Sequence, residues 1–309
     1  MRWKSRSAAV VAAALLMTGA ATTAVYASAE PGGPDGDASS VEPFTGVAAC
    51  AFDTNGRRVW VFAGNWDGVG GDGVGIVRDT GSGLAWYLRN SLTTGKADIV
   101  FNYGASGDWP VVGDWDGVGG DGIGITRPAG NAANEIQWQL RNAPGGGAAD
   151  TKFNYGRHGY FPVTGDWDGV GGDGVGVAGG DANGNKAWHL RNSASGGAAN
   201  YDFLFGLTGN GDVPVTGDWD GVGGDGPGVV RKSGILDWHL RNANNNGPTD
   251  HRFSYGQATT DCFLSGDWDG AGGEGPGAVR YSGGVLQWHL RNTSSAGADN
   301  YTFVYGPPA

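Results

Sequence analysis

Residues 113–122 read GDWDGVGGDG, and close variants of these ten residues occur at four other places in the chain. The five copies begin at Gly64, Gly113, Gly165, Gly217 and Gly266. A second motif, W-x-L-R-N, begins at Trp86, Trp138, Trp188, Trp238 and Trp288, and a third, F-x-[YF]-G, begins at Phe101, Phe153, Phe203, Phe253 and Phe303. Three markers that recur in the same order, about fifty residues apart, are the signature of a repeat architecture.

Each repeat has the pattern of four short strands. In the repeat that contains residues 113–122, apolar residues alternate with glycine or polar residues at 123–127 and at 136–141, a period typical of β strands. No window has a helical period, and the 62 glycines of the chain disfavour long helices. Gly122 and Gly124 share one strand face, which predicts that a neighbouring backbone comes close there.

Four strands in a unit of about fifty residues are typical of a β-propeller blade. We therefore expect an all-β fold, a five-bladed β-propeller with four short antiparallel strands in each blade. An open solenoid of the same units is the alternative.

The N-terminal segment indicates export. A basic start (MRWKSRS) precedes an apolar stretch that ends in Ala27-Ser28-Ala29, the pattern of a secretory signal peptide at residues 1–29. A membrane anchor is the competing interpretation. Residues 30–43 are rich in proline, glycine and serine, which predicts a disordered linker. Residues 44–309 then form the single propeller domain of a secreted, extracellular protein.

The charge of the expected mature chain excludes some partners. Without the three basic residues of the signal, 17 basic and 31 acidic residues remain, a net charge of −14 with histidine neutral. Such a surface repels nucleic acid and anionic lipid, and no later segment is long and apolar enough for membrane insertion. We expect a soluble monomer.

The chain has two cysteines, Cys50 and Cys262. In an oxidising compartment an even pair usually forms a disulfide, and in a closed ring this bond would join the first and fifth repeats. Two separate buried thiols are the alternative.

The repeats resemble the tandem FG-GAP/VCBS-type repeats of integrin-like propellers, and especially a short bacterial version found in secreted and surface proteins. The resemblance covers residues 57–306 and rests on the P-V-x-G-D-W-D-G approach, the glycine-rich turn, the G-x-G-[IV] strand and the W-x-L-R-N strand. The resemblance implies a propeller, commonly stabilised by calcium, that displays loops for binding. It implies no particular catalytic reaction.

The family's calcium loop is matched only in part. In the second repeat Asp114 and Asp116 stand at the first and third ligand positions, but Val118 replaces the fifth ligand and Asp121 lies one position before the ninth. Two carboxylates usually make a weak calcium site, and aspartates in such turns also bind nearby backbone amides. The candidate calcium ligands are Asn65, Asp67, Asp114, Asp116, Asp166, Asp168, Asp218, Asp220, Asp267 and Asp269.

No other cofactor is required by any motif. The recurring arginines of W-x-L-R-N could pair with the turn aspartates, which would explain why both repeat. These arginines are Arg89, Arg141, Arg191, Arg241 and Arg291.

One aromatic position varies among the repeats. Trp60, Trp109 and Phe161 share this position, which Val213 and Cys262 occupy in the last two repeats. Variation within strict repetition suggests an exposed site, and aromatic faces beside polar side chains suit sugar rings. Packing between blades is the alternative.

The sequence gives little support for catalysis. His189, His239 and His289 occupy one repeated slot, far apart and without metal-ligand spacing. Glu135 is the only glutamate outside the leader and the repeated turns, whereas glycosidases need two carboxylates in one pocket. We therefore expect not an enzyme but a secreted binding module, carbohydrate-binding through grooves between blades. The alternative is an integrin-like propeller with an extracellular protein partner or an adhesive role.

Overall fold

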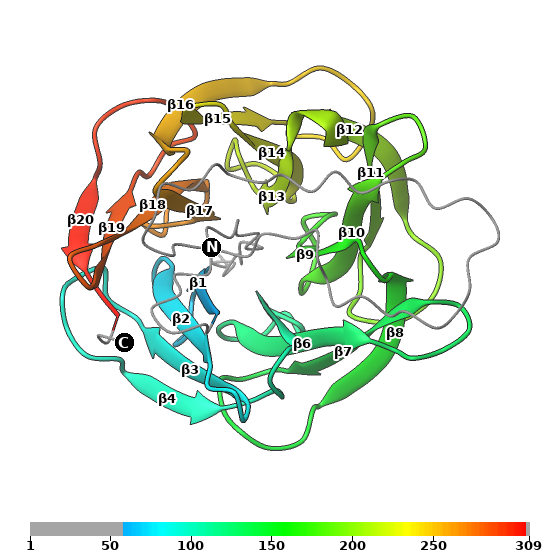
Figure 1. The fold of residues 1–309 in the computed structure, drawn as a ribbon, viewed down its shortest axis with the longest axis horizontal. Helices are drawn as coiled ribbons and strands as arrows, with labels where there is room; N and C mark the ends of the chain where they lie inside the picture. The colour runs from blue at the N-terminus through cyan, green and yellow to red at the C-terminus, as the bar shows by residue number, and fades with distance from the viewer. Residues whose placement is uncertain (1–57, 307–309) are drawn as a thin grey trace, which may run out of the picture.

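The computed structural model describes residues 58–306, which form five four-stranded antiparallel sheets around a central axis (Figure 1). The predicted five-bladed β-propeller is confirmed. The signal peptide, the linker, Cys50 and the first residues of the predicted domain lie outside the described residues, so these predictions stay open.

The blades follow chain order, with four consecutive strands in each. Blade 1 contains β1 (Val59–Gly64), β2 (Gly73–Asp79), β3 (Leu84–Arg89) and β4 (Ile99–Asn102). Blade 2 contains β5 (Trp109–Gly113), β6 (Gly122–Pro128), β7 (Glu135–Arg141) and β8 (Thr151–Arg157). Blade 3 contains β9 (Phe161–Gly165), β10 (Gly174–Gly180), β11 (Asn185–Arg191) and β12 (Tyr201–Leu207). Blade 4 contains β13 (Val213–Gly217), β14 (Gly226–Lys232), β15 (Ile235–Leu240) and β16 (His251–Gln257), and blade 5 contains β17 (Asp261–Gly266), β18 (Gly275–Ser282), β19 (Val285–Leu290) and β20 (Tyr301–Val304).

The first strand of each blade is the innermost one. β1, β5, β9, β13 and β17 contact one another in turn, and the contact of β17 with β1 closes the ring. Hydroxyl groups reinforce three of these steps: Thr164 donates to the carbonyl of Val112 (2.8 Å), Thr216 to that of Thr164 (2.9 Å) and Ser265 to that of Thr216 (2.8 Å). The closed ring excludes the open solenoid.

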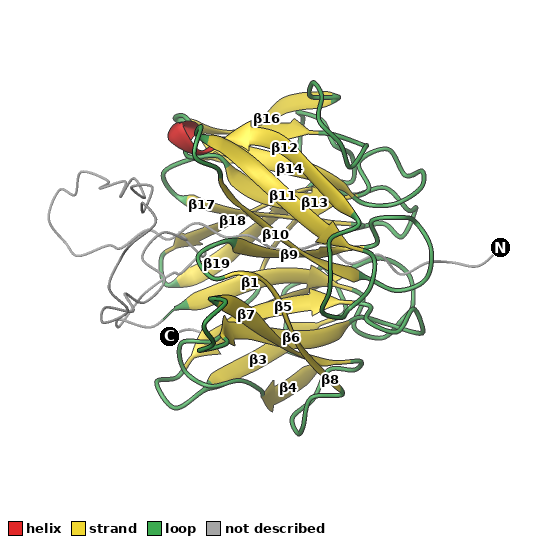
Figure 2. Cartoon of the chain, turned by 90° about the vertical axis from the view of Figure 1, so that its right-hand side faces the viewer, coloured by secondary structure: helices red, strands yellow, loops and turns green. Residues whose placement is uncertain are grey.

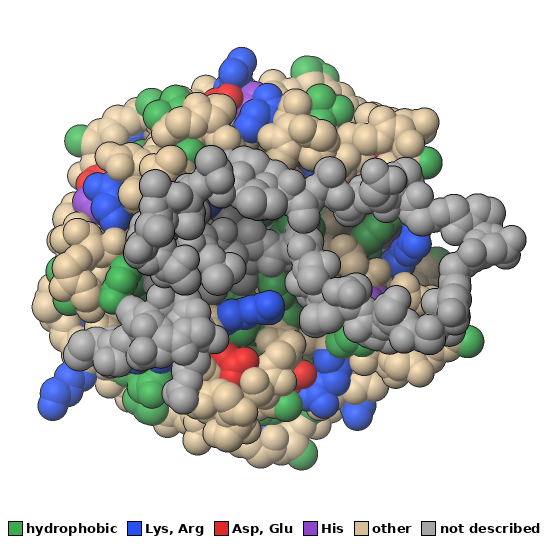
Figure 3. Space-filling model, viewed as in Figure 1, with side chains coloured by type: hydrophobic (Ala, Val, Ile, Leu, Met, Phe, Trp, Pro, Cys, Tyr) green, Lys and Arg blue, Asp and Glu red, His purple; other side chains and the backbone are tan. Residues whose placement is uncertain are grey.

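The two ends of the propeller carry different loops. Because neighbouring strands are antiparallel, all GDWDG turns lie at one end, which we call the turn face. The segments that lead from one blade to the next lie at the other end, the connection face. The 3-10 helix η1 (Thr208–Asn210) belongs to this second end, which appears on the left in Figure 2 and faces the viewer in Figures 1 and 3.

The W-x-L-R-N and F-x-[YF]-G motifs build the core of each blade. Their tryptophans are 0% exposed, and each indole stacks on the phenylalanine of the neighbouring fourth strand, at 5.8 Å for Trp86 and Phe101. Each indole N–H donates to a carbonyl seventeen residues later, such as Trp138 to Tyr155 at 2.9 Å. The two motifs recur together because the third and fourth strands depend on this contact.

Glycine in the second strand is required by close packing, as predicted. A side chain at Gly122 would overlap the carbonyl oxygen of Arg141. At Gly124 an added Cβ would meet the side chain of Leu140 first, at 2.4 Å, and the backbone carbonyl oxygen of Gln139 at 3.2 Å. The described part of the chain contains no helix that is long and apolar enough to cross a membrane.

The last acid of each GDWDG turn joins two blades. Asp121 of blade 2 donates its backbone N–H to the carbonyl of Asn65 in blade 1 (2.7 Å), and its carboxylate accepts the N–H of the same Asn65 (2.6 Å). Asp173 and Asp225 bind the turns of blades 2 and 3 in the same way. We call this pair of hydrogen bonds the inter-blade clasp.

One clasp also closes the ring. Asp72 in blade 1 donates its N–H to the carbonyl of Asp267 in blade 5 (2.7 Å) and accepts the N–H of Asp267 (2.9 Å). The two residues are 195 positions apart in the chain. The clasp therefore connects the first and last blades through noncovalent bonds, independently of any disulfide.

Removing a clasp carboxylate should weaken the fold. Asp121→Ala leaves the buried N–H of Asn65 without its acceptor, so we expect the free energy of unfolding to fall by about 1–3 kcal/mol. Urea denaturation measures this change. Glu274→Ala is the matched control, because Glu274 holds the same position in blade 5 but makes only the backbone bond, to Asp218 (2.8 Å). Equal losses for both variants would contradict the importance of the clasp.

Candidate functional site

The predicted calcium ligands converge on a backbone amide. In blade 2 the Oδ1 atoms of Asp114 and Asp116 both accept the N–H of Val118, at 3.2 Å and 3.1 Å. Val118 is the residue that replaces the fifth calcium ligand, and its side chain points to solvent. The other four turns repeat this arrangement, with Val69, Val170, Val222 and Ala271 as donors.

The remaining oxygen of the second aspartate binds asparagine, not arginine. Asp116 accepts a bond from the side-chain amide of Asn142 (2.8 Å), the last residue of W-x-L-R-N. Arg141 instead donates to the carbonyl of Ala148 in its own blade. The prediction that these arginines pair with turn aspartates is wrong. They bind the loop between the third and fourth strands, as do Arg89, Arg191, Arg241 and Arg291.

This geometry does not fit a calcium ion in the turns. A cation between Asp114 and Asp116 would face the positive end of the Val118 N–H dipole, which already fills that position. Among residues 58–306 no group of three or more His, Cys, Asp or Glu side chains could hold a metal ion. Calcium at the turns stays a prediction, and the observed arrangement is that of a self-bonded turn.

Five buried carboxyl groups surround the axis beneath the turn face. They come from the last acid of each turn, and none is more than 2% exposed. Burial and the charges of Asp121 and Asp267 raise the pKa of Asp72 well above its usual range. Burial, then Asp225 and Asp121, act in the same way on the pKa of Asp173. The axial carboxyls are Asp72, Asp121, Asp173, Asp225 and Glu274.

Glu274, the fifth of these axial carboxyls, is affected by acids from around the ring. Burial and the charges of Asp225, Asp72, Asp267 and Asp173 raise the pKa of Glu274. These acids belong to four different turns, so the effects place Glu274 among carboxyls from around the ring. In the sequence the last acid of the turn stands one position before a calcium-ligand position, and the local pattern gives no sign that it contacts another blade.

These buried acids should make the protein less stable as pH rises. Asp72, Asp173 and Glu274 have raised folded-state pKa values. Their contribution to the free energy of unfolding is therefore complete below the unfolded pKa of about 4, and it is lost as pH rises from there through the folded-state pKa. Urea denaturation in a chelating buffer, between about pH 5 and pH 7.5, should show a falling free energy of unfolding, by up to about 1.4 kcal/mol per pH unit for each proton. Burial lowers the pKa of His158. The titration of this histidine therefore opposes the fall in stability only below about pH 6.5.

Asp173→Asn is the informative variant for this pH dependence. Its side-chain carbonyl can still accept the N–H of Asp114, but the group no longer titrates, so the slope should decrease. A stability that rises with pH across this range, or an unchanged slope in Asp173→Asn, would contradict the assignment.

The predicted aromatic ligand sites are mostly core. Trp60 is 1% exposed and Trp109 is 5% exposed, and their rings meet edge to face with centroids 6.2 Å apart. The expectation of an exposed position is therefore wrong for these two tryptophans, which pack between blades 1 and 2. Only Phe161 is half-buried.

Phe161 faces an unusual lysine. The Lys186 ammonium lies 5.1 Å from the centre of the Phe161 ring, and burial lowers the pKa of Lys186 to about 8, partly offset by the charge of Asp212. The corresponding residues of the other blades are buried leucine or isoleucine: Leu84, Ile136, Leu236 and Leu286. A lysine at a position that is otherwise apolar is a signal that sequence analysis missed.

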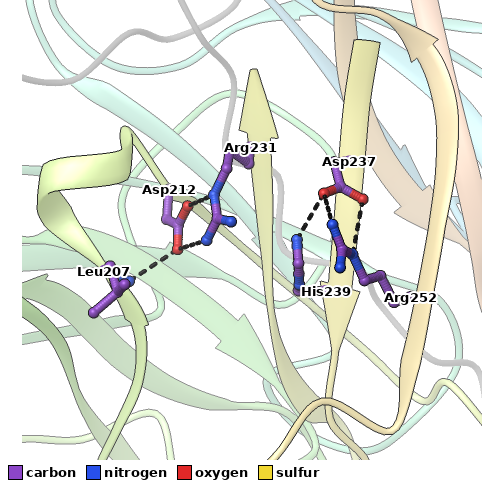
Figure 4. A network of polar contacts seen from close by, with 6 residues as sticks. All are labelled: Leu207, Asp212, Arg231, Asp237, His239 and Arg252. Carbon is purple, nitrogen blue, oxygen red and sulfur yellow. Dashed lines mark hydrogen bonds and ion pairs between the residues drawn. The ribbon is translucent and has the colours of Figure 1, made fainter. Parts of the chain in front are cut away.

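Blade 3 also lacks an ion pair that three other blades share. In blade 4 the buried Asp212 accepts two bonds from Arg231 (2.7 Å and 3.0 Å) and one from the N–H of Leu207 (2.8 Å), as Figure 4 shows. Blades 2 and 5 have the equivalent pairs Asp108–Arg127 and Asp261–Arg280. In blade 3 Tyr160 and Gly179 replace the two partners.

The Tyr160 ring covers the space that Gly179 leaves. A side chain at Gly179 would collide with this ring. Tyr160 also stacks on His189 with centroids 6.0 Å apart, and its hydroxyl donates to the carbonyl of Gly180 (3.1 Å). Blade 3 therefore departs from the repeat on the connection face.

The repeated histidines bind aspartates. His189 pairs with Asp202, and His289 pairs with Asp299 at 2.8 Å. His239 lies 2.9 Å from Asp237, which Arg252 also contacts at 2.9 Å (Figure 4). The pairs of His189 and His289 join a strand to the next strand or loop, whereas His239 and Asp237 lie in the same strand and Arg252 provides the contact to β16.

A groove with a cavity volume of about 680 Å³ lies between blades 1 and 2. One wall comes from β4, the segment after it and the hairpin between β2 and β3, and the other from β6 and β7. The Tyr103 hydroxyl joins the walls by donating to the carbonyl of Gln139 (3.1 Å). Its lining side chains that can form hydrogen bonds are Thr80, Ser82, Asn102, Tyr103, Arg127 and Gln139.

The structure also places Glu135, considered for catalysis, and Cys262, considered for a disulfide. Glu135 accepts bonds from the amides of Asn131 (2.6 Å) and Asn154 (3.5 Å), and it does not line the groove. These contacts give no support to a two-carboxylate glycosidase site. Cys262 is buried in β17, and its predicted bond to Cys50 lies outside the described residues.

No protein-family model, curated protein or solved structure matches this chain. The likeness to FG-GAP/VCBS repeats therefore rests on the motifs themselves, whereas the five-bladed propeller rests on the structure.

Proposed function

We propose that this protein is a secreted, non-catalytic carbohydrate-binding module, and that its ligand occupies the groove between blades 1 and 2. The groove itself is the observation that supports this function. Its volume of about 680 Å³ is within the range of small-molecule sites, about 300–1,000 Å³.

The lining chemistry suits a sugar. Hydroxyl groups of Thr80 and Ser82 and amides of Asn102 and Gln139 can both donate and accept hydrogen bonds. Ala105 adds a small exposed apolar surface, which matches the C–H face of a pyranose ring. Sugars present hydroxyl groups and apolar patches together, so a groove that combines amides, hydroxyls and one aliphatic side chain is complementary to them.

A protein partner is the second candidate. In Figure 3 acidic and basic side chains are interspersed on the visible part of the connection face, without one large patch of a single sign. This gives no electrostatic signature for a highly charged partner. The concave site therefore favours a glycan.

A glycan array followed by calorimetry on the hits tests the proposal. Asn102→Ala and Gln139→Ala each remove hydrogen-bonding groups from the groove, so we expect each variant to lose about tenfold in affinity, equivalent to about 1.4 kcal/mol. Asn154→Ala is the matched control, because Asn154 follows the same phenylalanine in β8 and lies outside the groove. Its affinity should stay within about twofold of the wild type.

If the protein bound no glycan on the array, the proposal would be overturned and a protein partner favoured. Equal weakening by Asn154→Ala and Asn102→Ala would show that sugars bind elsewhere on the molecule. The array is run with calcium and with chelator, so that a metal requirement is measured separately from the groove.

A further inference from the structure

Arg127, which lines the groove between blades 1 and 2, is bound less completely than the equivalent arginines of blades 4 and 5. Arg231 donates to Asp212 from both Nε (2.7 Å) and Nη2 (3.0 Å), as Figure 4 shows. The equivalent pair of blade 5 has the same two bonds, at 2.7 Å and 2.8 Å. Arg127 donates to Asp108 from Nη2 alone. The blade 2 arginine therefore has the same kind of partner but only one of the two hydrogen bonds.

The Arg127 guanidinium keeps donors that no described residue accepts. A guanidinium has five N–H donors, and within residues 58–306 the bond to Asp108 is the one hydrogen bond that the Arg127 side chain makes. Its Nε is buried without an acceptor, whereas its Nη1 group has no acceptor and is not buried. The side chain is 36% exposed, compared with 27% for Arg231. The Nη1 group can therefore donate to a ligand in the groove.

Arg127 is the one charged side chain that lines the groove. Asp108 is 6% exposed and does not line it. The chain as a whole is acidic, but at physiological ionic strength a Debye length of about 8 Å screens its more distant charges. A ligand in the groove thus meets one cation and no anion. The other polar side chains of the lining are uncharged: Thr80, Ser82, Asn102, Tyr103 and Gln139.

We propose that the groove binds a carboxylated sugar, a hexuronic acid residue, whose carboxylate accepts hydrogen bonds from Arg127. The inference rests on the carbohydrate-binding function proposed above and names the class of sugar. Hydrogen bonds between a guanidinium and a carboxylate are roughly twice as strong as those between neutral groups. The hydroxyl groups of the same sugar can bind the uncharged side chains of the lining, such as Asn102 and Gln139.

Calorimetry with matched ligands tests the class of sugar. The probes are oligomers of galacturonic, glucuronic and mannuronic acid, each also as the methyl ester, which removes the charge and keeps the sugar ring. The wild type should bind at least one of these acids about tenfold or more tightly than its ester. Arg127→Gln removes the guanidinium, so the ratio of the two affinities should fall to within about twofold.

Two further variants separate this effect from a loss of folding. Arg231→Gln is the matched control, because it leaves the buried Asp212 without its arginine in the same way but lies outside the groove. It should keep the ratio of the wild type. Asp108→Asn removes the carboxylate that competes for Arg127, and its side-chain oxygen can still accept the N–H of Ala105 (2.7 Å). It should increase the affinity for the free acid by about threefold or more, a gain that misfolding cannot produce.

The outcomes distinguish this inference from the carbohydrate function itself. Equal binding of acid and ester, tighter binding of a sulfated or neutral oligosaccharide, or an unchanged ratio in Arg127→Gln would each overturn the uronic acid assignment. If binding were still weakened by Asn102→Ala in any of these cases, the groove would remain a sugar site. If no acidic, esterified, sulfated or neutral glycan bound, the carbohydrate function and this inference would both be overturned.

Discussion

The inter-blade clasp is the constraint on which the rest of this propeller depends. A turn that contributes one carboxylate and one N–H to the preceding blade positions two backbones within hydrogen-bonding distance. Because Asp72 meets Asp267 in the same way as Asp121 meets Asn65, the last contact of the ring is equivalent to the others. Closure therefore requires no element outside the repeat.

This arrangement places several acids in a buried space. Each carboxylate that joins two blades also lies near other carboxylates, so burial and mutual repulsion raise the pKa of Asp72, Asp173 and Glu274. The hydrogen bonds to backbone N–H groups offset part of this cost at the aspartates. At Glu274 that compensation is absent, because neither of its side-chain oxygens has a hydrogen-bond partner among the described residues.

Departures from the repeat are as informative as the repeat. Regular positions such as Trp138 or Asp121 maintain the blade or the junction, and they recur because every blade has the same packing. Glu274 at one junction, and Tyr160, Gly179 and Lys186 in blade 3, break this regularity without disturbing the strands. The groove between blades 1 and 2 likewise depends on local side chains, including Gln139, whose position is Tyr or His in every other blade.

The sequence by itself determined the number of blades, the four strands of each and the buried tryptophans, because strand periodicity and repeated motifs depend on local patterns. It could not determine which groups of different blades meet. The burial of Trp60 and Trp109, the asparagine partners of the turn aspartates and the clasp made by Asp121 were decided only by the tertiary structure. The clasps and the contact of Trp60 with Trp109 join residues about fifty or more positions apart, and their geometry depends on how closely neighbouring blades approach. The asparagine partners lie 22–26 positions from the turn aspartates within one blade, and they depend on how two turns of that blade fold against each other.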